Sequence, residues 1–324
     1  MNIKYGIIGL GGIAQVFAGA LNTVPGTELE AVASGSRERA EAFSKKFKAS
    51  KIYDSYIELI HDKEVDVVYV ALTHNFHYDI VKMCLENGKA VLCEKPLAIN
   101  KKDAEELIAL SRKNKVLLME AMWTRCLPSF QKTKKWVEEG KIGDIRLIDA
   151  KFCINIPYDP KHRLFNPELA GGSLYDLGVY VIEFTTGILG EKPETVSGFA
   201  TVAETGVDDF AVINMSFKSG ALAMLSCGIR AKTNRDAGIY GTNGSIVVYE
   251  FFSSRKCELY DKDNNLVESF EDTCEEGFTY QIRHFNELFK NKKQESDIIP
   301  LEDTAVCADV FDKLLNQWGI TGST

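Results

Sequence analysis

Over the first third of the chain, apolar residues are spaced in two different ways, one typical of β-strands and one typical of helices. Short, nearly continuous apolar runs predict β-strands, and the amphipathic stretches between them predict helices. Strands that alternate with helices are joined by right-handed crossovers, so this part is predicted to be a doubly wound parallel sheet, an α/β fold. The predicted strands are 5–8, 29–34, 65–71, 90–93 and 116–119, and the predicted helices are 14–21, 38–47, 56–61, 78–86 and 102–114.

The pattern changes after about residue 120. Two helices are predicted first, followed by strands that are separated by turns rather than by helices. Such consecutive strands predict a mostly antiparallel sheet, and we expect two domains, 1–121 and 122–324, the second of α+β type. The predicted helices are 128–140, 173–189, 279–290 and 301–318, and the predicted strands are 196–204, 210–217, 221–229, 239–241, 245–249, 257–260 and 267–270.

The first predicted strand runs directly into the turn Gly9-x-Gly11-x-x-Ala14 and a helix. Gly9 permits a tight turn, Gly11 lets the backbone approach a phosphate, and Ala14 is small enough for the helix to pack on the strand. Gly12 and Ile13 belong to the first helical turn, whose unpaired N–H groups attract an anion. This order predicts a dinucleotide-binding site of the Rossmann type; the alternative is a plain glycine-rich turn.

The residues after the second predicted strand bear on the choice of cofactor. An acid at this point would bind the ribose 2′-hydroxyl of NAD, but Ser34 and Gly35 stand there instead, with Arg37 and Arg39 close behind. Serine and arginine suit a 2′-phosphate, so we expect NADP, with NAD as the second possibility. The alternative is that the two arginines only decorate the first turn of a helix.

Two further strand ends are expected at the same edge of the sheet. Leu72, Thr73 and His74 follow the strand 65–71 and are predicted to line the ribose and diphosphate of the cofactor. His77 belongs to the same segment, where we expect it to be a structural hydrogen-bonding residue rather than a catalyst. Thr73 has an alternative role as the cap of the next helix.

Charged residues follow the strand 90–93. Burying the charged side chains of Glu94 and Lys95 at a strand end costs free energy unless they are paired or serve a function. At the ligand edge of such a sheet we expect Lys95 to be functional and to lie near the cofactor; the alternative is an ordinary surface lysine. Pro96 restricts the backbone of Lys95 and permits a cis peptide bond.

The second half contains one distinctive block, Ala170-Gly-Gly-Ser-Leu-Tyr-Asp-Leu-Gly-Val-Tyr180. Asp176 and Tyr180 are four residues apart, so they share one face of the predicted helix. An acid and a phenol on one face could bind a hydroxyl group and move its proton, with Lys95 approaching from the other domain. The alternative is a packed tyrosine and a locally hydrogen-bonded aspartate.

Composition narrows the function classes. The chain has 324 residues, is 45% hydrophobic and carries a net charge of −8 without a basic run, which argues against nucleic acid or an anionic membrane as a partner. No apolar run approaches the length of a membrane span. The eight cysteines, Cys274 among them, form no ligand cluster, so we expect reduced thiols in a cytoplasmic protein and no metal site. The first strand begins too near Met1 to leave room for a signal peptide.

Together these motifs resemble the glucose–fructose oxidoreductase and inositol dehydrogenase (Gfo/Idh/MocA) family over essentially the whole chain. The resemblance implies a Rossmann domain, a second domain with an open antiparallel sheet, nicotinamide-dependent oxidation of a hydroxyl group and Lys95 at the catalytic site. Tyr180, where many members have histidine, is similar to the branch of dimeric dihydrodiol dehydrogenases, which also oxidises aldoses such as D-xylose. By this resemblance Trp123, Asp176 and Tyr180 line the substrate pocket. The arginine that often follows Ser34 in the family is absent.

The sequence thus predicts an NAD(P)-dependent oxidoreductase acting on a secondary alcohol of a small polyol, sugar or cyclic diol. Tyr180 would exchange the hydroxyl proton, Lys95 would favour the phenolate, and Asp176 would orient the substrate. A homodimer is expected through the C-terminal sheet, whose strands carry apolar residues on both faces. The alternatives are a dinucleotide-binding sensor without turnover, and an enzyme that uses its cofactor transiently for elimination or epimerisation.

Overall fold

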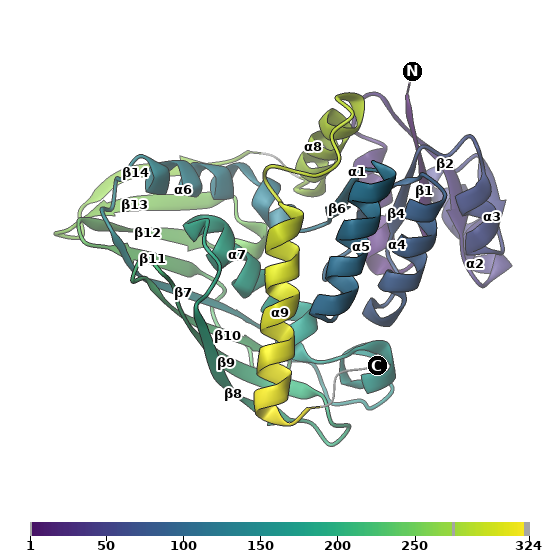
Figure 1. Cartoon of the computed structure of the whole chain (residues 1–324). Helices are drawn as coiled ribbons and strands as arrows, with labels where there is room; N and C mark the ends of the chain where they lie inside the picture. The colour runs from purple at the N-terminus through teal and green to yellow at the C-terminus, as the bar shows by residue number, and fades with distance from the viewer. Residues whose placement is uncertain (1, 274–275, 321–324) are drawn as a thin grey trace. The chain divides into compact units, whose positions relative to one another are not determined.

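The computed structural model describes residues 2–273 and 276–320, which form two compact units (Figure 1). The first unit contains the chain up to Ala98, Lys102–Trp123 and Glu276–Leu301. The second contains Ile99–Lys101 and the described residues 124–273 and 302–320. Each unit therefore combines segments that are far apart in the sequence. Cys274 lies outside the described residues.

The first unit is built on a six-stranded sheet with the order β3-β2-β1-β4-β5-β6. All neighbouring strands are parallel, and the order reverses between β1 and β4, which confirms the predicted doubly wound sheet. The short edge strand β3 was not predicted, because its three residues are only half buried. The strands are β1 (Ile3–Ile8), β2 (Thr27–Ala33), β3 (Lys51–Tyr53), β4 (Val67–Val70), β5 (Ala90–Cys93) and β6 (Leu118–Glu120).

Helices of the first unit form two groups of neighbours. One group joins α1 to α2 and α8, and the other joins α3 to α4, as expected for crossovers on opposite faces of a sheet whose strand order reverses. The late helix α8 is fixed to the first strand, since the Tyr5 hydroxyl donates to Asn286 Oδ1 at 2.7 Å. These helices are α1 (Gly12–Leu21), α2 (Arg37–Phe47), α3 (Tyr56–His61), α4 (His77–Glu86), α5 (Lys101–Asn114) and α8 (Phe278–Lys290).

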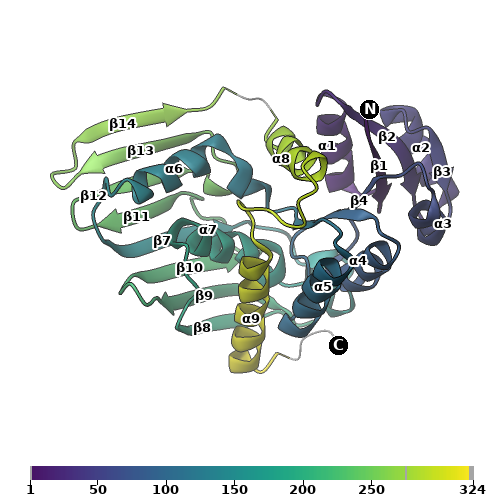
Figure 2. The same ribbon diagram turned by 45° about the horizontal axis from the view of Figure 1, so that its top comes forward.

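The second unit contains an eight-stranded sheet with the order β14-β13-β12-β11-β7-β10-β9-β8 (Figure 2). Its neighbours are antiparallel except β7 and β10, which are parallel. The mostly antiparallel sheet is thus confirmed. The strands are β7 (Ile145–Cys153), β8 (Thr195–Val202), β9 (Asp208–Ser216), β10 (Leu222–Gly228), β11 (Ala237–Gly241), β12 (Gly244–Tyr249), β13 (Lys256–Asp261) and β14 (Leu266–Glu271).

The sequence pattern missed β7, which lies in the middle of this sheet. Charged residues interrupt its apolar run, and two of them, Asp149 and Lys151, form an ion pair at 3.0 Å. Residues 149 and 151 point to the same side of the strand, because side chains alternate in a β-strand. β7 therefore buries one face only, and its mixed composition disguised it.

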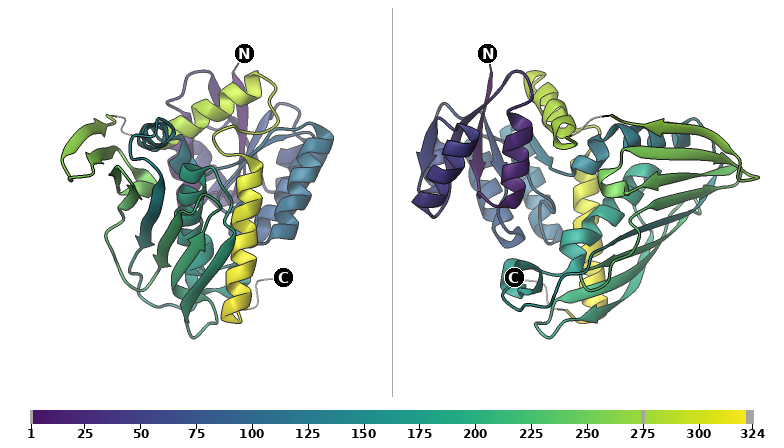
Figure 3. Two further views of the ribbon diagram at one scale, coloured as in Figure 1. Left: turned by 60° about the vertical axis from the view of Figure 1, so that its left-hand side comes forward. Right: turned by 180° about the vertical axis from the view of Figure 1, so that it is seen from behind.

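Helices cover one face of the second sheet: α6 (Pro128–Glu138), α7 (Val179–Leu189) and α9 (Leu301–Trp318) (Figure 2). α6 contacts β12 and β13, and α7 contacts β7 and β10. The opposite face has no helix of this unit across it in the described chain (Figure 3, right). We call it the open sheet face; its exposed apolar residues are Phe199, Val212, Leu222, Met224 and Tyr240. No described helix is long and apolar enough to cross a membrane.

Candidate active site

The turn after β1 has the backbone of a phosphate-binding loop. Gly9 has φ +86°, and a Cβ there would lie 2.6 Å from the carbonyl oxygen of Ala71. A Cβ at Gly11 or Gly12 would meet nothing within 4 Å, so the backbone at the start of α1 faces open space. No side chain caps this helix N-terminus, while Ala14 is fully buried. The free N–H groups and the positive end of the helix suit an anion.

The end of β2 leads into a tight, polar turn. Ser34 is buried and its Oγ accepts from Ser36 N at 3.3 Å, and Ser36 in turn caps α2 through Arg39 N at 3.3 Å. Arg37 is engaged by Glu41 at 3.0 Å and by Asp54 at 3.5 Å, whereas the exposed Arg39 side chain forms no ion pair with any described residue. Arg39 is therefore the more available cation.

The end of β4 carries the next predicted cofactor residues. Leu72 and Thr73 are half-buried, and His74 is buried. Thr73 stands at the cap position of the 3-10 turn His74–Phe76, but its hydroxyl contacts Asn75 Oδ1 at 2.7 Å and does not cap the backbone. These residues follow the strand that neighbours β1, so they lie where open α/β sheets bind their ligands.

His77 is fully buried between two carbonyl oxygens. Its Nδ1 lies 2.8 Å from Pro96 O and its Nε2 lies 3.1 Å from Leu72 O. Burial lowers the pKa of the His77 ring, and the charge of Lys95 lowers it further, against the raising effect of the two carbonyls. A neutral imidazole donates to only one of these oxygens. The ring thus ties the β4 end to the segment after β5, as a structural residue would.

Glu94 and Lys95 follow β5 at the neighbouring strand end. Glu94 is buried and accepts a hydrogen bond from the Tyr69 hydroxyl, and the Lys95–Pro96 peptide bond is cis. Lys95 is half-buried. Trp123 belongs to the same unit and packs its ring 5.0 Å from the ring of Phe278.

In the second unit Asp176 and Tyr180 lie on one continuous helical segment. Residues Leu174–Gly178 form a π-helical turn that runs directly into α7. The predicted helix 173–189 is present, but its first turn is wider than an α-helix, a feature that is frequent at functional sites. Asp176 and Tyr180 are both buried, at 7% and 8% exposure.

Aromatic rings surround the Tyr180 side chain. Phe152 meets the Tyr180 ring edge-on at 5.2 Å, and Phe252 does so at 6.2 Å. Phe152 and Phe252 stack on each other at 4.2 Å, and the Arg235 guanidinium lies 5.0 Å from the Phe252 ring. Thr124 Oγ1 donates to Phe252 O at 2.6 Å. The ring of Tyr180 is thus fixed by packing.

Asp208 holds the start of this helical segment from β9. Its Oδ2 accepts from Ser173 Oγ at 2.6 Å and from Leu174 N at 2.7 Å. Gly172 has φ +110°, and a Cβ there would lie 2.4 Å from Asp208 Oδ1. The glycine therefore makes room for the carboxylate that caps the helix.

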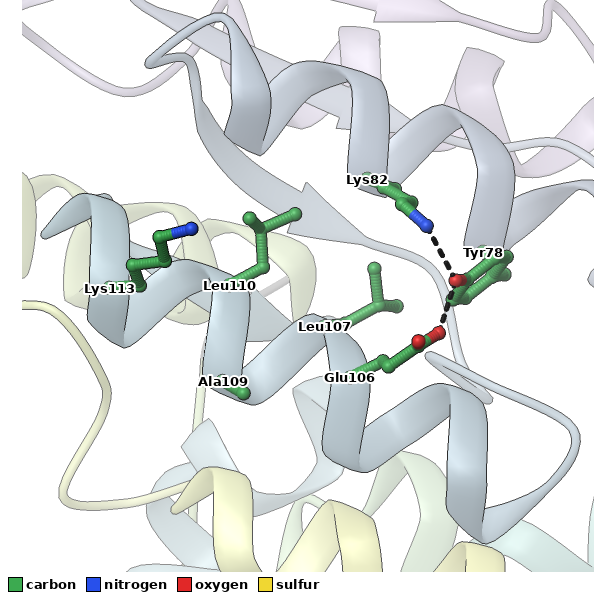
Figure 4. Close-up of a pocket in the computed structure, with 7 residues that line it drawn as sticks. All are labelled: Tyr78, Lys82, Glu106, Leu107, Ala109, Leu110 and Lys113. Atoms are coloured by element: carbon green, nitrogen blue, oxygen red, sulfur yellow. Dashed lines mark hydrogen bonds between the residues drawn. The ribbon is translucent and has the colours of Figure 1, made fainter.

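A separate groove of about 240 Å³ lies in the first unit between α4 and α5 (Figure 4). Lys82 Nζ donates to the Tyr78 hydroxyl at 2.9 Å, and that hydroxyl donates to Glu106. None of its lining residues is a predicted site residue, so this groove is distinct from the strand ends described above. The lining residues are Tyr78, Lys82, Glu106, Leu107, Ala109, Leu110 and Lys113. No group of three or more His, Cys, Asp or Glu side chains in the described chain is arranged to hold a metal.

Comparison with known families agrees with this geometry. Residues 3–122 match the model of the GFO/IDH/MocA oxidoreductase family with an NAD-binding Rossmann fold, and residues 130–247 match the C-terminal domain of the same family. The chain belongs to the GFO/IDH/MocA oxidoreductase family. It is therefore an NAD(P)-dependent oxidoreductase, which confirms the family resemblance and the enzyme class expected from the sequence.

This oxidoreductase is similar to several known proteins over nearly their full length. It is 36% identical to trans-1,2-dihydrobenzene-1,2-diol dehydrogenase of Xenopus laevis, over 99% of each chain, and 32% identical to that of Homo sapiens, over 99% and 98%. KijD10, a 3-ketoreductase from Actinomadura kijaniata solved with NADP and TDP-benzene, is 26% identical with a TM-score of 0.86 over 98% of both chains. An aldose-aldose oxidoreductase from Caulobacter crescentus, at 23% identity and a TM-score of 0.88 over 98% and 97%, shares the fold.

Sequence reasoning missed three parts of this oxidoreductase's candidate site. Phe152 and Phe252 gave no signal, because they come from β7 and from the turn after β12 and meet Tyr180 only in the folded unit. Asp208 gave no signal of its capping role, because that role depends on where β9 places it in the folded unit. Arg163, which forms an ion pair with Asp176, was not identified from the sequence either.

Replacing Asp208 tests whether it fixes the helix that carries Asp176 and Tyr180. We expect Asp208→Ala to lower the free energy of unfolding by about 1–3 kcal/mol, since it leaves the Leu174 N–H buried without an acceptor. Asp208→Asn is the matched control, because its amide oxygen can accept the same two hydrogen bonds. Urea unfolding followed by circular dichroism measures both. Equal stability of the two variants would show that the capping contact is unimportant.

Wild type and Asp208→Asn are also expected to differ in how their stability depends on pH. Burial raises the pKa of the Asp208 carboxyl to about 6, from an ordinary value of 3.8. A pKa raised in the folded state contributes stability below about pH 4 that is lost as pH rises through about 6. Since one pKa unit corresponds to about 1.4 kcal/mol, wild type should lose about 2–3 kcal/mol more than Asp208→Asn between about pH 4 and pH 7. Parallel pH profiles would contradict this.

Proposed function

We propose that the chain is an NADP-preferring dehydrogenase acting on a secondary alcohol of a small polyol, sugar or cyclic diol. Residues 1–121 would bind the cofactor and residues 122–324 the substrate. The observation that carries the proposal is the pairing of a phenol, Tyr180, and a carboxylate, Asp176, on one buried helical segment. The relatives named dihydrodiol dehydrogenases support the substrate class.

The residues have distinct roles in this proposal. A bound nicotinamide would supply the acceptor for the hydride that leaves the carbinol carbon. Tyr180 takes the hydroxyl proton, and the positive charge of Lys95 favours the phenolate by lowering the tyrosine pKa from its reference of about 10. Asp176 accepts a hydrogen bond from the substrate, and Trp123 contributes an apolar wall next to Phe278. The residues at the ends of β1, β2, β4 and β5, from Gly9 to Glu94, hold the cofactor.

The decisive test of this function is a substrate panel followed by reduced-nicotinamide absorbance, with NADP and NAD in parallel. Cyclic diols, polyols and aldoses form the panel. Oxidation of at least one of these classes supports the proposal. Steady NADP binding without turnover on any of them would instead indicate a dinucleotide-binding sensor or regulatory protein.

Arg39 is proposed to bind the 2′-phosphate of NADP. A charge-assisted hydrogen bond contributes about 1.5–3 kcal/mol, so Arg39→Ala should raise the Kd for NADP about 10- to 100-fold and leave the Kd for NAD unchanged. Arg37→Ala is the matched control, because Arg37 is already paired with Glu41 and Asp54, and it should have a smaller effect. Fluorescence titration with both cofactors measures the constants. NAD binding as tightly as NADP to wild type would refute the preference.

A homodimer through the open sheet face is part of the proposal. Phe199 is 84% exposed and Leu222 is 54% exposed, and strand pairing places them with Val212, Met224 and Tyr240 on the same side of the sheet. An exposed apolar surface of this kind marks an interface, and a twofold dimer is the simplest closed arrangement that covers it.

Light scattering tests the dimer. We expect wild type at micromolar concentration to have twice the mass of the 36.1 kDa chain. A Leu222→Glu, Met224→Glu variant should give the mass of one chain, because it places charges in the apolar surface. Lys63→Glu, at an exposed position of the first unit, is the control and should stay dimeric. A wild-type mass near 36.1 kDa would contradict the dimer.

A cytoplasmic location also belongs to the proposal. The described cysteines are all buried, and reduced thiols are expected in a protein of a reducing compartment. Cell fractionation tests this location.

A further inference from the structure

Arg163 forms a partly open ion pair with Asp176. Its Nη1 and Nη2 lie 3.2 Å from Asp176 Oδ1, and Nη2 lies 3.4 Å from Oδ2. Charged N–H···O hydrogen bonds are usually about 2.7–2.9 Å long, so the contacts between Arg163 and Asp176 are longer than usual. The Arg163 side chain is 48% exposed, whereas that of Asp176 is 9% exposed. The arginine therefore covers a buried carboxylate while facing solvent itself.

The loop that carries Arg163 is fixed to the start of the same helical segment. Gly171 N donates to Asn166 O at 3.0 Å, and Gly172 N donates to Leu164 O at 2.8 Å. A Cβ at Gly171 would lie 2.7–2.8 Å from the carbonyl oxygens of Arg163, Leu164 and Asn166. Gly171 thus allows the loop to lie directly on the helix start, which brings the Arg163 side chain to Asp176.

We propose that Arg163 determines substrate specificity: together with Asp176 it binds a second hydroxyl group, on the carbon next to the one that is oxidised. This inference rests on the proposed function of Tyr180 and Asp176. A guanidinium has five N–H donors, and the contacts with Asp176 use at most three of them. The others have no partner among the described residues. One substrate hydroxyl can therefore donate to Asp176 and accept from Arg163.

The chemistry of the pair selects a neutral substrate. The opposite charges of Arg163 and Asp176 compensate each other, and a carboxylate or phosphate would be repelled by Asp176. The position of the pair selects neighbouring oxygens. Asp176 and Tyr180 are four residues apart on one helical segment, so side chains from both can reach oxygens on neighbouring carbon atoms. The substrate class is therefore a vicinal diol, as in a cyclic diol or a sugar.

The test compares trans-cyclohexane-1,2-diol with cyclohexanol, for wild type and Arg163→Gln. We expect the variant to lose about 10- to 100-fold in kcat/KM for the diol, mainly through KM, because one charge-assisted hydrogen bond is removed. The kcat/KM for cyclohexanol should change less than about threefold. Arg163→Lys should restore part of the diol preference. Arg146→Gln removes an arginine from an exposed strand position of the same unit and should change neither substrate.

Calorimetry separates this inference from the proposed function. Diol and cyclohexanol are titrated into each protein in the presence of oxidised cofactor. Tighter diol binding by wild type than by Arg163→Gln, without turnover, would support the inference and reject the dehydrogenase. Equal losses for both substrates in Arg163→Gln would show that Arg163 only supports the loop, and would overturn the inference. A variant defect confined to a 2-hydroxy acid of similar size would overturn it too, because it would assign Arg163 to an anion.

Discussion

Replacing Tyr180 by phenylalanine is expected to lower kcat by about 10²–10⁴-fold, the usual contribution of general acid–base catalysis. Phenylalanine keeps the ring that packs edge-on against Phe152 and Phe252 and removes only the phenolic proton. The midpoint of thermal unfolding and the Kd for the cofactor should therefore stay close to wild type. Steady-state kinetics on the best substrate of the panel, together with calorimetry, measures the three quantities.

Two histidines are the competing proton acceptors, because imidazole is the commonest general base in enzymes. His77 is buried between two backbone carbonyls, and burial lowers the pKa of its ring. His162 accepts from Leu164 N at 3.3 Å through Nδ1, in the loop that carries Arg163. Both sets of contacts are structural, so His162→Gln should retain most activity. If Tyr180→Phe remained active while a histidine variant lost turnover, the phenol would be structural.

The periodic parts of the fold could be predicted from the sequence because they bury one face or both. The buried strands β1, β4 and β5 gave continuous apolar runs, and α7 followed a glycine pair that marked its start. β7 could not be recognised in the same way, because Asp149 and Lys151 lie on the face that the helices leave uncovered. The π-helical turn at Leu174–Gly178 also left no pattern, and the hydrogen bond from Leu174 N to Asp208 at its start joins residues that are 34 positions apart.

The cofactor half of the candidate site was easier to predict than the substrate half. Gly9 and Ala14 act through the local backbone, and the structure gives them the φ angle and the burial that their motif requires. Arg163 contacts Asp176 across a loop of twelve intervening residues, which spacing along the chain does not reveal. The available signal in the sequence was Gly171 itself, because glycine allows another backbone segment to approach closely, and in the structure three carbonyl oxygens surround the place of its missing Cβ.

Lys95→Met should lower kcat by about the same factor as Tyr180→Phe, because in the proposed mechanism the ammonium group favours the phenolate that acts as the base. Methionine keeps most of the side-chain length, and the buried neighbours Glu94 and His77 keep their hydrogen bonds with Tyr69 and Pro96. The double variant should be no more than about threefold slower than either single one, since residues that act as a unit have non-additive effects. Lys82→Met, on α4 of the same unit, is the matched control and should keep wild-type kcat. Multiplicative losses in the double variant would mean that the lysine and the tyrosine act in separate steps, and the shared proton-transfer role would have to be abandoned.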